Sequence, residues 1–290
     1  MNTQITFPGL GLSFSPNRVA FNLFGKDIYW YGIIIAIGFL VAVLFCSKQA
    51  KKYGITGDDI IDVLIFAVPI AIIGARLYYV IFYFSQFQTE INGVLRPDFE
   101  KIIAIWDGGL AIYGGIIAAI LTVWVVCKVK KIGFGAFCDL CGFGLLIGQA
   151  IGRWGNFINR EAFGCETTLP WRMGLYAPDY MEVHPTFLYE SLWNTIGFLL
   201  LFWLSKKIVR KFDGQFFLCY IAWYGLGRAM IEGLRTDSLY FFDFTLLGMP
   251  IRVSQLLAAL SCLTAVVILI IQLVFRKHKP EELYVNRIHT

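Results

Sequence analysis

The segment GFGLLIGQAIGRWGNFINREAFG, residues 142–164, decides the fold class because its first half is apolar and its second half is polar. Gly144, Gly148 and Gly152 recur every four residues, and this spacing puts small residues on one helix face, where membrane helices can approach closely. Four hydrogen-bonding side chains follow within nine residues, namely Arg153, Asn156, Asn159 and Glu161. The segment therefore predicts a membrane helix that ends in a polar site.

The composition extends this prediction to the whole chain. Of the 290 residues 58% are hydrophobic and 16% charged, whereas a soluble domain carries about 25% charged residues. We therefore expect a single all-α domain over residues 1–290, a polytopic membrane protein with no separate soluble domain. About 20 apolar residues cross a bilayer, and seven stretches reach that length, near 28–47, 60–84, 108–127, 133–151, 186–205, 215–233 and 253–275. The short link KVKK, residues 128–131, predicts a hairpin between the third and fourth.

The basic residues predict the topology. Eleven of the 13 lysines follow the first, third, fifth and seventh stretches, so the positive-inside rule places those ends in the cytoplasm, the N-terminus outside and the C-terminus inside. The net charge of +5 follows from these lysines and indicates no nucleic-acid partner. Turn formers throughout residues 1–27 argue against a cleaved signal peptide. Together with 85–105, 162–183 and 236–252, these residues are expected to form a small extracytoplasmic cap.

The arginines follow a different distribution. Nine of the 12 lie outside or near the outer ends of the predicted spans. Arginine presents a planar fork suited to phosphate or carboxylate, so an external anionic ligand is the natural hypothesis. Arg76 lies in this group, within GARLYYVIFYF near the outer end of the second span, where it could also simply reach the headgroups.

The sixth span carries one polar face. Tyr224, Arg228, Glu232 and Arg235 are spaced by 4, 4 and 3 residues, which puts them within about 80° on a helix. Each charge near a bilayer centre costs about 2.5–3.5 kcal/mol. A structural ion pair between helices would explain the face without function. Two arginines for one carboxylate instead favour a positive site for an anion.

Smaller features surround these two segments. His184 and Glu190 open the fifth span in HPTFLYE, and Tyr31 opens the first. Seven cysteines include the CxxC pair Cys138 and Cys141, but an odd count with no second pair predicts neither a disulfide framework nor a metal site. The sequence contains no nucleotide-binding glycine loop, HExxH zinc motif or GxSxG elbow.

The segment GRWGNFINREAFG, residues 152–164, closely resembles the signature GRxGNFxNxExxG of the bacterial prolipoprotein diacylglyceryl transferases. Further blocks resemble that family in the family's order, and they are WYG at 30–32, GARLYYVIFY at 74–83, WDGG at 106–109, HPTFLYE at 184–190 and YGLGRAMIEGLR at 224–235. Together they cover nearly the whole chain, so the ordered set is far more specific than one block.

The resemblance implies an enzyme of the bacterial plasma membrane whose active site faces the extracytoplasmic side. It would move the diacylglyceryl group of phosphatidylglycerol to the lipobox cysteine of a prolipoprotein signal peptide, form a thioether and release glycerol phosphate, with no metal or organic cofactor. The implied catalytic residues are Arg153, Arg228, Asn156, Glu161, Tyr31 and Tyr113. The implied substrate-binding residues are Arg153, Arg76, Arg235, Glu232, Tyr224, Gly164, His184, Glu190 and Asn159.

In the expected mechanism, Arg153 and Arg228 neutralise the charge on the leaving phosphate, supported by Arg76 and Arg235. Asn156 orients the headgroup, while Glu161 and Glu232 hold the arginines. Tyr31 and Tyr224 line the pocket.

Two positions depart from the family pattern. Tyr113 stands where many members carry a histidine proposed as the base, and tyrosine titrates near 10, so it is a poor base. Glu161, Glu190 and His184 are other candidates for that role, and a positive pocket that lowers the thiol pKa could make a strong base unnecessary. Phe187 stands where the family often has glutamine, which we expect to affect packing or the entrance.

Two other functions fit the residues less well. An arginine-lined cavity alone would also suit a transporter or flippase for an anionic lipid or solute, but only an enzyme would convert a lipobox peptide into a thioether-linked product. A membrane-embedded hydrolase would need a nucleophile pair, and the sequence indicates none.

Overall fold

The computed structural model describes residues 4–91, 94–176, 179–236, 240–246 and 249–287. A long helix lies at each of the seven predicted stretches. These helices are α1 (Trp30–Gln49), α2 (Gly57–Phe82), α4 (Ile112–Val129), α5 (Phe134–Asn159), α6 (Thr186–Lys207), α7 (Gln215–Glu232) and α8 (Val253–Ile270). Within the described residues, six helices are long and apolar enough to cross a membrane, and α7, which carries Arg228 and Glu232, is not among them.

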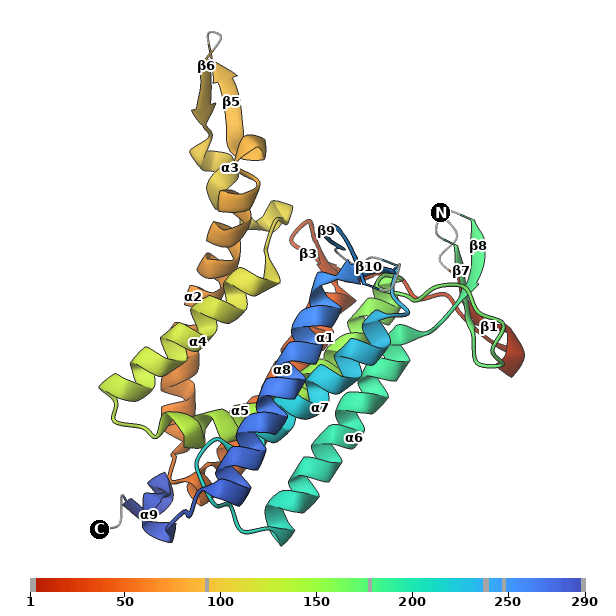
Figure 1. The fold of residues 1–290 in the computed structure, drawn as a ribbon. Coiled ribbons are helices and arrows are strands. Elements are labelled where there is room, and N and C mark those ends of the chain that lie inside the picture. The colour runs from red at the N-terminus through yellow and green to blue at the C-terminus, as the bar shows by residue number, and fades with distance from the viewer. Residues whose placement is uncertain (1–3, 92–93, 177–178, 237–239, 247–248, 288–290) are drawn as a thin grey trace.

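The helices form a central bundle and a separate pair (Figure 1). In the bundle, α5 packs along α1, α6 and α7, and α8 packs along α7. In the pair, α2 and α4 pack so closely at Gly74 and Gly114 that a Cβ on Gly74 would lie 2.9 Å from the Gly114 carbonyl oxygen. The predicted hairpin of the third and fourth stretches is therefore wrong: α4 packs along α2, and α4 and α5 diverge after their short link.

Two of the three glycines on the predicted face of α5 pack closely against α1, whereas a Cβ on Gly148 would meet no atom within 4 Å. A Cβ on Gly144 would lie 3.0 Å from Cys46 Sγ, and one on Gly152 would lie 3.1 Å from Ile35 Cδ1, both on α1. The helix itself is longer than predicted, because it continues through Asn159 and ends where Arg160 adopts a left-handed conformation with φ 55°. Arg153, Asn156 and Asn159 are thus on the helix and not in the connection after it.

The connections between helices contain short strands that the all-α prediction omitted. A four-stranded antiparallel sheet has the order β2 (Leu12–Phe14), β1 (Ile5–Phe7), β7 (Met173–Tyr176) and β8 (Tyr180–Val183). Three hairpins accompany it, formed by β3 (Val19–Leu23) with β4 (Lys26–Tyr29), β5 (Gln88–Ile91) with β6 (Val94–Pro97), and β9 (Tyr240–Leu246) with β10 (Met249–Arg252). Strands of three to seven residues are too short for the period-two pattern to stand out.

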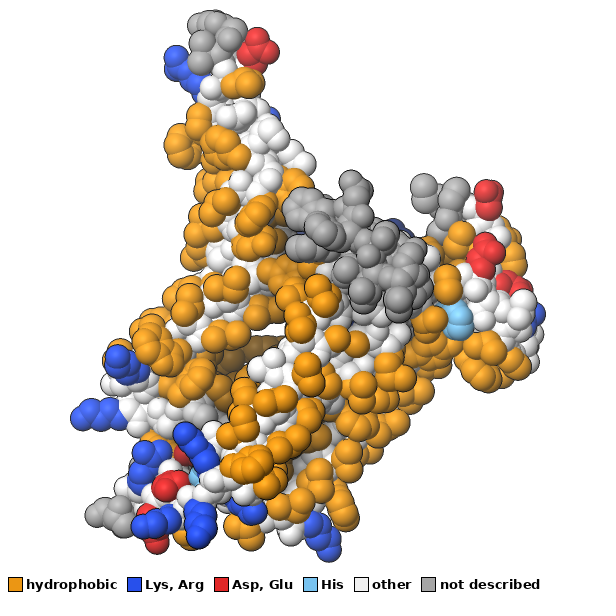
Figure 2. Space-filling model, in the orientation of Figure 1, with side chains coloured by type: hydrophobic (Ala, Val, Ile, Leu, Met, Phe, Trp, Pro, Cys, Tyr) orange, Lys and Arg blue, Asp and Glu red, His pale blue; other side chains and the backbone are white. Residues whose placement is uncertain are grey.

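The strands gather at one end of the helices, and α9 (Tyr284–Arg287) lies at the other end (Figure 1). Short helices complete the connections, namely α3 (Phe99–Ile103) and the single turns η1 (Pro8–Leu10), η2 (Ala50–Tyr53), η3 (Phe84–Phe87), η4 (Ile105–Asp107), η5 (Ile271–Phe275) and η6 (Pro280–Glu282). Apolar side chains cover the helices, and basic side chains gather at the α9 end (Figure 2). The molecule thus has a strand-rich end and a basic end.

Candidate functional site

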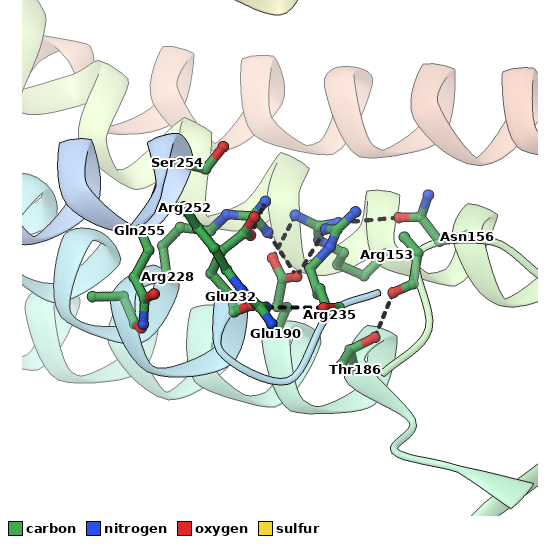
Figure 3. Close-up of polar contacts among 12 residues, drawn as sticks. Arg153, Asn156, Thr186, Glu190, Arg228, Glu232, Arg235, Arg252, Ser254 and Gln255 are labelled. Atoms are coloured by element: carbon green, nitrogen blue, oxygen red, sulfur yellow. Dashed lines mark hydrogen bonds and ion pairs between the residues drawn. The ribbon is translucent and has the colours of Figure 1, made fainter. Parts of the chain in front are cut away.

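Glu190 is the centre of a buried ion cluster at the strand-rich end of the bundle (Figure 3). It lies in the first turns of α6 and is only 3% exposed. Its carboxylate pairs with Arg153 from α5, with Arg228 from α7 at 3.0 Å, and with Arg235, which follows α7, at 3.5 Å. A buried carboxylate needs partners to offset its desolvation, and here three segments of the chain supply them.

A second carboxylate extends the cluster. Glu232 Oε2 lies 2.5 Å from Arg228 Nη2, one helical turn away on α7. Arg252, at the start of α8, donates to the backbone carbonyl of Glu232 and, at 2.9 Å, to that of Arg235. The cluster therefore contains four guanidinium groups and two buried carboxylates. The sequence placed Arg252 with the outer arginines but did not mark it as a site residue, although its position directly before an apolar span was a signal.

The polar end of α5 joins the cluster through Asn156. Arg153 Nη1 donates to Asn156 Oδ1 at 3.3 Å, and Asn156 Nδ2 donates to Glu161 Oε1 at 2.8 Å. Asn159 Nδ2 also donates to Glu161, at 3.4 Å. Glu161 thus contacts the two amides and reaches Arg153 through Asn156, so any hold that it has on an arginine is indirect.

Three segments of the chain meet at Gly164, namely the turn after α5, the residues just before α6 and Arg235 after α7. Its N–H donates to the His184 carbonyl at 3.0 Å, and it forms an isolated antiparallel bridge with Arg235. A Cβ at this position would lie 2.6 Å from His184 Cβ, closer than real side chains approach. The Thr186 hydroxyl closes the same crossing by donating to the Ala162 carbonyl at 2.5 Å. The missing side chain of Gly164 therefore allows the segment after α5 to pack directly against His184.

His184 lies beside this crossing, outside the helices. Its Nδ1 is 3.2 Å from the Tyr189 hydroxyl. Partial burial lowers the pKa of His184 below its ordinary value of 6.5, because desolvation disfavours the imidazolium. The side chain is therefore biased toward the neutral form, which is the form a proton acceptor requires.

Two tyrosines line the helices next to the cluster. The Tyr31 ring packs α1 against α5 at Gly155, where an added Cβ would come within 2.7 Å of it. Tyr224 lies one turn before Arg228 and stacks on Tyr220, with ring centroids 5.8 Å apart. Gln149 Nε2 donates to the Tyr220 hydroxyl at 3.0 Å. Gln149 was not predicted, since a lone glutamine in an apolar run carries no clear signal.

Arg76 is not brought into the cluster. Its guanidinium donates to five backbone carbonyls, two of them in the glycine pair of WDGG, Gly108 at 2.6 Å and Gly109 at 2.9 Å. The other three are Lys101, Ile102 and Ala104. It also lies over the Phe87 ring at 4.9 Å. These contacts tie the end of α2 to the segment before α4, so the structure gives Arg76 an anchoring role.

Two further predicted positions lie apart from the ion cluster. The Tyr113 hydroxyl, in the first turn of α4, is 3.3 Å from Ser254 Oγ at the start of α8. This contact bridges the helix pair and the bundle at the strand-rich end. Phe187 is buried and packs against Phe157 at 4.6 Å and Trp154 at 5.5 Å between ring centroids. Phe187, which stands where the family often has glutamine, thus packs within an aromatic cluster.

No group of three or more His, Cys, Asp or Glu side chains that could hold a metal ion occurs in the part of the chain that the structure describes. The chemistry of the site is instead that of guanidinium groups, amides and carboxylates. Such a set binds an anion and stabilises negative charge that develops on it.

Fold and site together define the class: a multi-pass helical membrane protein with an arginine-rich polar cluster among its helices. The model of the prolipoprotein diacylglyceryl transferase family matches residues 18–271. The chain belongs to this family.

Curated relatives agree along almost the whole length. A phosphatidylglycerol–prolipoprotein diacylglyceryl transferase of Finegoldia magna is 45% identical over 252 residues, which cover 87% of this chain and 94% of the relative. An enzyme of the same name from Enterococcus faecalis is 41% identical over 280 residues, covering 93% and 94%. One from Oceanobacillus iheyensis is 41% identical over 284 residues, covering 93% and 91%.

Proposed function

We propose that this chain transfers the diacylglyceryl group of phosphatidylglycerol to the lipobox cysteine of a prolipoprotein signal peptide. The thiol sulfur forms a thioether with the glycerol carbon, and glycerol phosphate leaves. This is the first step of lipoprotein maturation, and the activity follows from membership of the family and from the names of its relatives. The observation that carries the residue assignment is Glu190, which holds three arginines from three segments in one buried cluster.

The reaction needs a group that accepts negative charge on the phosphate. The thiolate attacks the glycerol carbon bonded to the phosphate oxygen, that carbon–oxygen bond breaks, and its electron pair stays on the phosphate. Arg153 and Arg228 are partly reachable at the edge of the cluster, with side-chain exposures of 20% and 16%. They bind the phosphate of the ground state and stabilise the charge added in the transition state.

The carboxylates and Asn156 set the geometry of the two arginines. Glu190 contacts both, and Glu232 fixes the other end of Arg228. Groups that are positioned before the reaction cost no reorganisation during it. Asn156, held between Arg153 and Glu161, orients the headgroup. Arg235, Tyr224, Tyr31, Asn159 and Gly164 complete the substrate-binding surface.

The thiol proton has three candidate acceptors in this site. Glu161 lies next to Asn156, Glu190 lies inside the cluster, and His184 is biased toward the neutral form. Glu190 is occupied by three arginines, so Glu161 and His184 are the better placed. Tyr113 contacts Ser254 and not the ion cluster. The arginines themselves favour the thiolate by lowering the thiol pKa.

We further propose that all seven long helices cross the bacterial plasma membrane, with the strand-rich end forming an extracytoplasmic cap and the lysine-rich end in the cytoplasm. The support is the lysine distribution and the separation of the two ends in Figures 1 and 2. The chain offers its own probe of this topology, because Cys165 in the cap is an exposed free thiol, while the other six cysteines lie in helices and are buried or half-buried. A membrane-impermeant maleimide should label intact cells through Cys165, and Cys165→Ser should abolish that labelling. Labelling only after the membrane is opened would reverse the topology.

The activity itself is tested with purified protein, phosphatidylglycerol and a lipobox peptide. The expected product is a thioether-linked diacylglyceryl peptide with an equimolar amount of glycerol phosphate. A peptide with serine in place of the lipobox cysteine is the control and should not react. Movement of phosphatidylglycerol between leaflets without any modified peptide would refute the transferase assignment and support a flippase.

A further inference from the structure

A polar cavity lies at the opposite end of the bundle from the Glu190 cluster, between the ends of α1 and α6. It has a volume of about 90 Å³ and shares no lining residue with that ion cluster. Its polar wall is formed by Gln49, Lys52, Ser205 and Arg210. Among the described residues that line it, two are cationic and none is a carboxylate. This volume is smaller than that of a pocket for a drug-sized ligand and suits one small polar group.

Arg210 is fixed at this wall by two aspartates that lie behind it. Its guanidinium lies 3.3 Å from Asp139 and 3.3 Å from Asp213, and it stacks over the Tyr53 ring at 4.5 Å. The Arg210 side chain is 9% exposed. Its orientation is therefore set before any ligand arrives, so little entropy is lost when one binds.

The other polar groups of the wall complement an anion. Lys52 Nζ donates to Gln49 Oε1 at 2.8 Å, which leaves the ammonium at the mouth with two further hydrogens. The Ser205 hydroxyl lines the cavity and donates to the Phe202 carbonyl at 2.7 Å, which leaves its oxygen as an acceptor. An ammonium, a guanidinium and a neutral amide suit a phosphate group, and the serine oxygen suits a glycerol hydroxyl.

The remaining walls are aromatic. Phe45 lies 5.3 Å from Phe202 and 6.1 Å from Phe143, and Phe143 lies 5.8 Å from Phe216, measured between ring centroids. All four phenylalanines line the cavity. A freely soluble anion gains nothing from such walls, whereas an amphiphile buries apolar surface against them. The volume suits a phosphate group and leaves no room for acyl chains, which would lie along the outside of the helices.

We propose that this cavity binds the phosphate headgroup of an anionic phospholipid, at a site separate from the transfer site. The lipid lies between the ends of α1 and α6, with its phosphate on Lys52 and Arg210 and its glycerol near Gln49 and Ser205. Because the cavity is at the lysine-rich end, the proposed topology would place this lipid in the cytoplasmic leaflet. The binding site itself does not depend on that topology or on the transferase activity.

The test is native mass spectrometry of the purified protein titrated with phosphatidylglycerol or with phosphatidylcholine. Ser205→Trp, which fills the cavity, should lower the affinity for one phosphatidylglycerol by about tenfold or more, and Lys52→Glu should do the same through charge. Ser205→Ala and Lys51→Glu are the matched controls and should retain that lipid. Lys51 is the exposed neighbour of Lys52 and does not line the cavity.

Four outcomes decide the interpretation. Transferase turnover of Ser205→Trp should equal that of the wild type, which shows that the lost lipid is not the substrate at the Glu190 cluster. Unchanged phosphatidylglycerol retention in both Ser205→Trp and Lys52→Glu would overturn the proposal. So would equal retention of phosphatidylcholine, which would mean no recognition of anionic charge, or displacement of the lipid by an excess of inorganic phosphate, which would assign the cavity to a soluble anion.

Discussion

Helix α5 carries a buried ion network near each end, and the two networks differ in composition. Near its C-terminal end, Arg153 joins a cluster of four arginines and two carboxylates. Near its N-terminal end, Asp139 belongs to a network in which one arginine, Arg210, lies between two aspartates. The two networks are about 20 Å apart along the helix.

The two networks differ in how fully their charges are satisfied. Asp139 is 0% exposed and, besides Arg210, accepts the backbone N–H groups of Gly214 at 3.0 Å and Phe217 at 2.9 Å. It thereby fixes the start of α7 against α5. The Glu190 cluster instead has more guanidinium groups than carboxylates, and two of its arginines remain partly exposed. A buried ion pair alone therefore does not identify a transfer site. For that site, an excess of arginines that the substrate can reach is the better criterion.

The largest expected effect is on catalysis at the Glu190 cluster. Arg153→Ala or Arg228→Ala should lower transfer to the lipobox peptide by about a thousandfold or more, because each removes a charge that stabilises the leaving phosphate. Arg153→Lys should recover little, since an ammonium lacks the planar fork. The measurement is the turnover of phosphatidylglycerol into thioether product by purified, folded protein.

Arg172 provides the matched control for these variants. It pairs with Glu182 in the cap, outside the cluster, so Arg172→Ala should keep near-normal turnover. Near-normal turnover in both Arg153→Ala and Arg228→Ala would instead show that the cation excess has no catalytic role, and the distinction between the two networks would fail.

The opposite network should respond in stability and not in chemistry. Asp139→Ala leaves Arg210 without its buried partner, and we expect a loss of about 3 kcal/mol in unfolding free energy, with normal turnover per folded molecule. Asp62→Ala is the control, because Asp62 pairs with Lys130 on the surface and such a pair contributes under about 1 kcal/mol. Thermal unfolding in detergent and specific activity give both quantities. A stable but inactive Asp139→Ala protein would contradict this division.

Arg76 sharpens the comparison because, among the described residues, its guanidinium contacts backbone carbonyls and an aromatic ring but no carboxylate. Arg76→Ala removes five hydrogen bonds to carbonyls, so unfolding should become easier by about 2 kcal/mol and residues 99–109 should be cleaved faster by protease. The KM for phosphatidylglycerol should change little. A large rise in KM with unchanged protease resistance would restore the earlier prediction that Arg76 binds substrate.

The positions of the helices could be predicted from sequence because hydropathy over about 20 residues is a local property. The Glu190 cluster was predicted only in part. Arg228, Glu232 and Arg235 share one helix face, which spacing reveals. That Glu190 on another helix is the partner of both Arg153 and Arg228 depends on how α5, α6 and α7 pack, and sequence spacing within one helix carries no such information.

The differences between the sequence predictions and the structure have one origin, namely contacts between residues that are far apart in the chain. The link between α4 and α5 is short, yet α4 packs along α2, where two glycines allow closer contact. Arg76 lies among aromatic residues at the outer end of a span, as a substrate-binding arginine could, but the loop that its guanidinium holds is 25 to 33 residues further along the chain. The strands of the cap are short, and their pairing joins residues as distant as Thr6 and Gly174.

The smallest expected effect is a pH dependence of stability that arises at His184, at the strand-rich end. The pKa of His184 is lowered in the folded protein, so below about pH 6.5 the unfolded state binds more protons at this group. Its contribution to stability is therefore complete above about pH 6.5 and is lost as the pH falls from there through the lower folded pKa. His184→Gln should flatten the thermal stability of the protein between about pH 6.5 and pH 5, whereas Asp62→Ala should not change this slope. His184 lies two residues before the start of α6, close to Glu190 on that helix. If the His184→Gln protein kept the wild-type dependence of thermal stability on pH, another group near the Glu190 cluster would be titrating in this window.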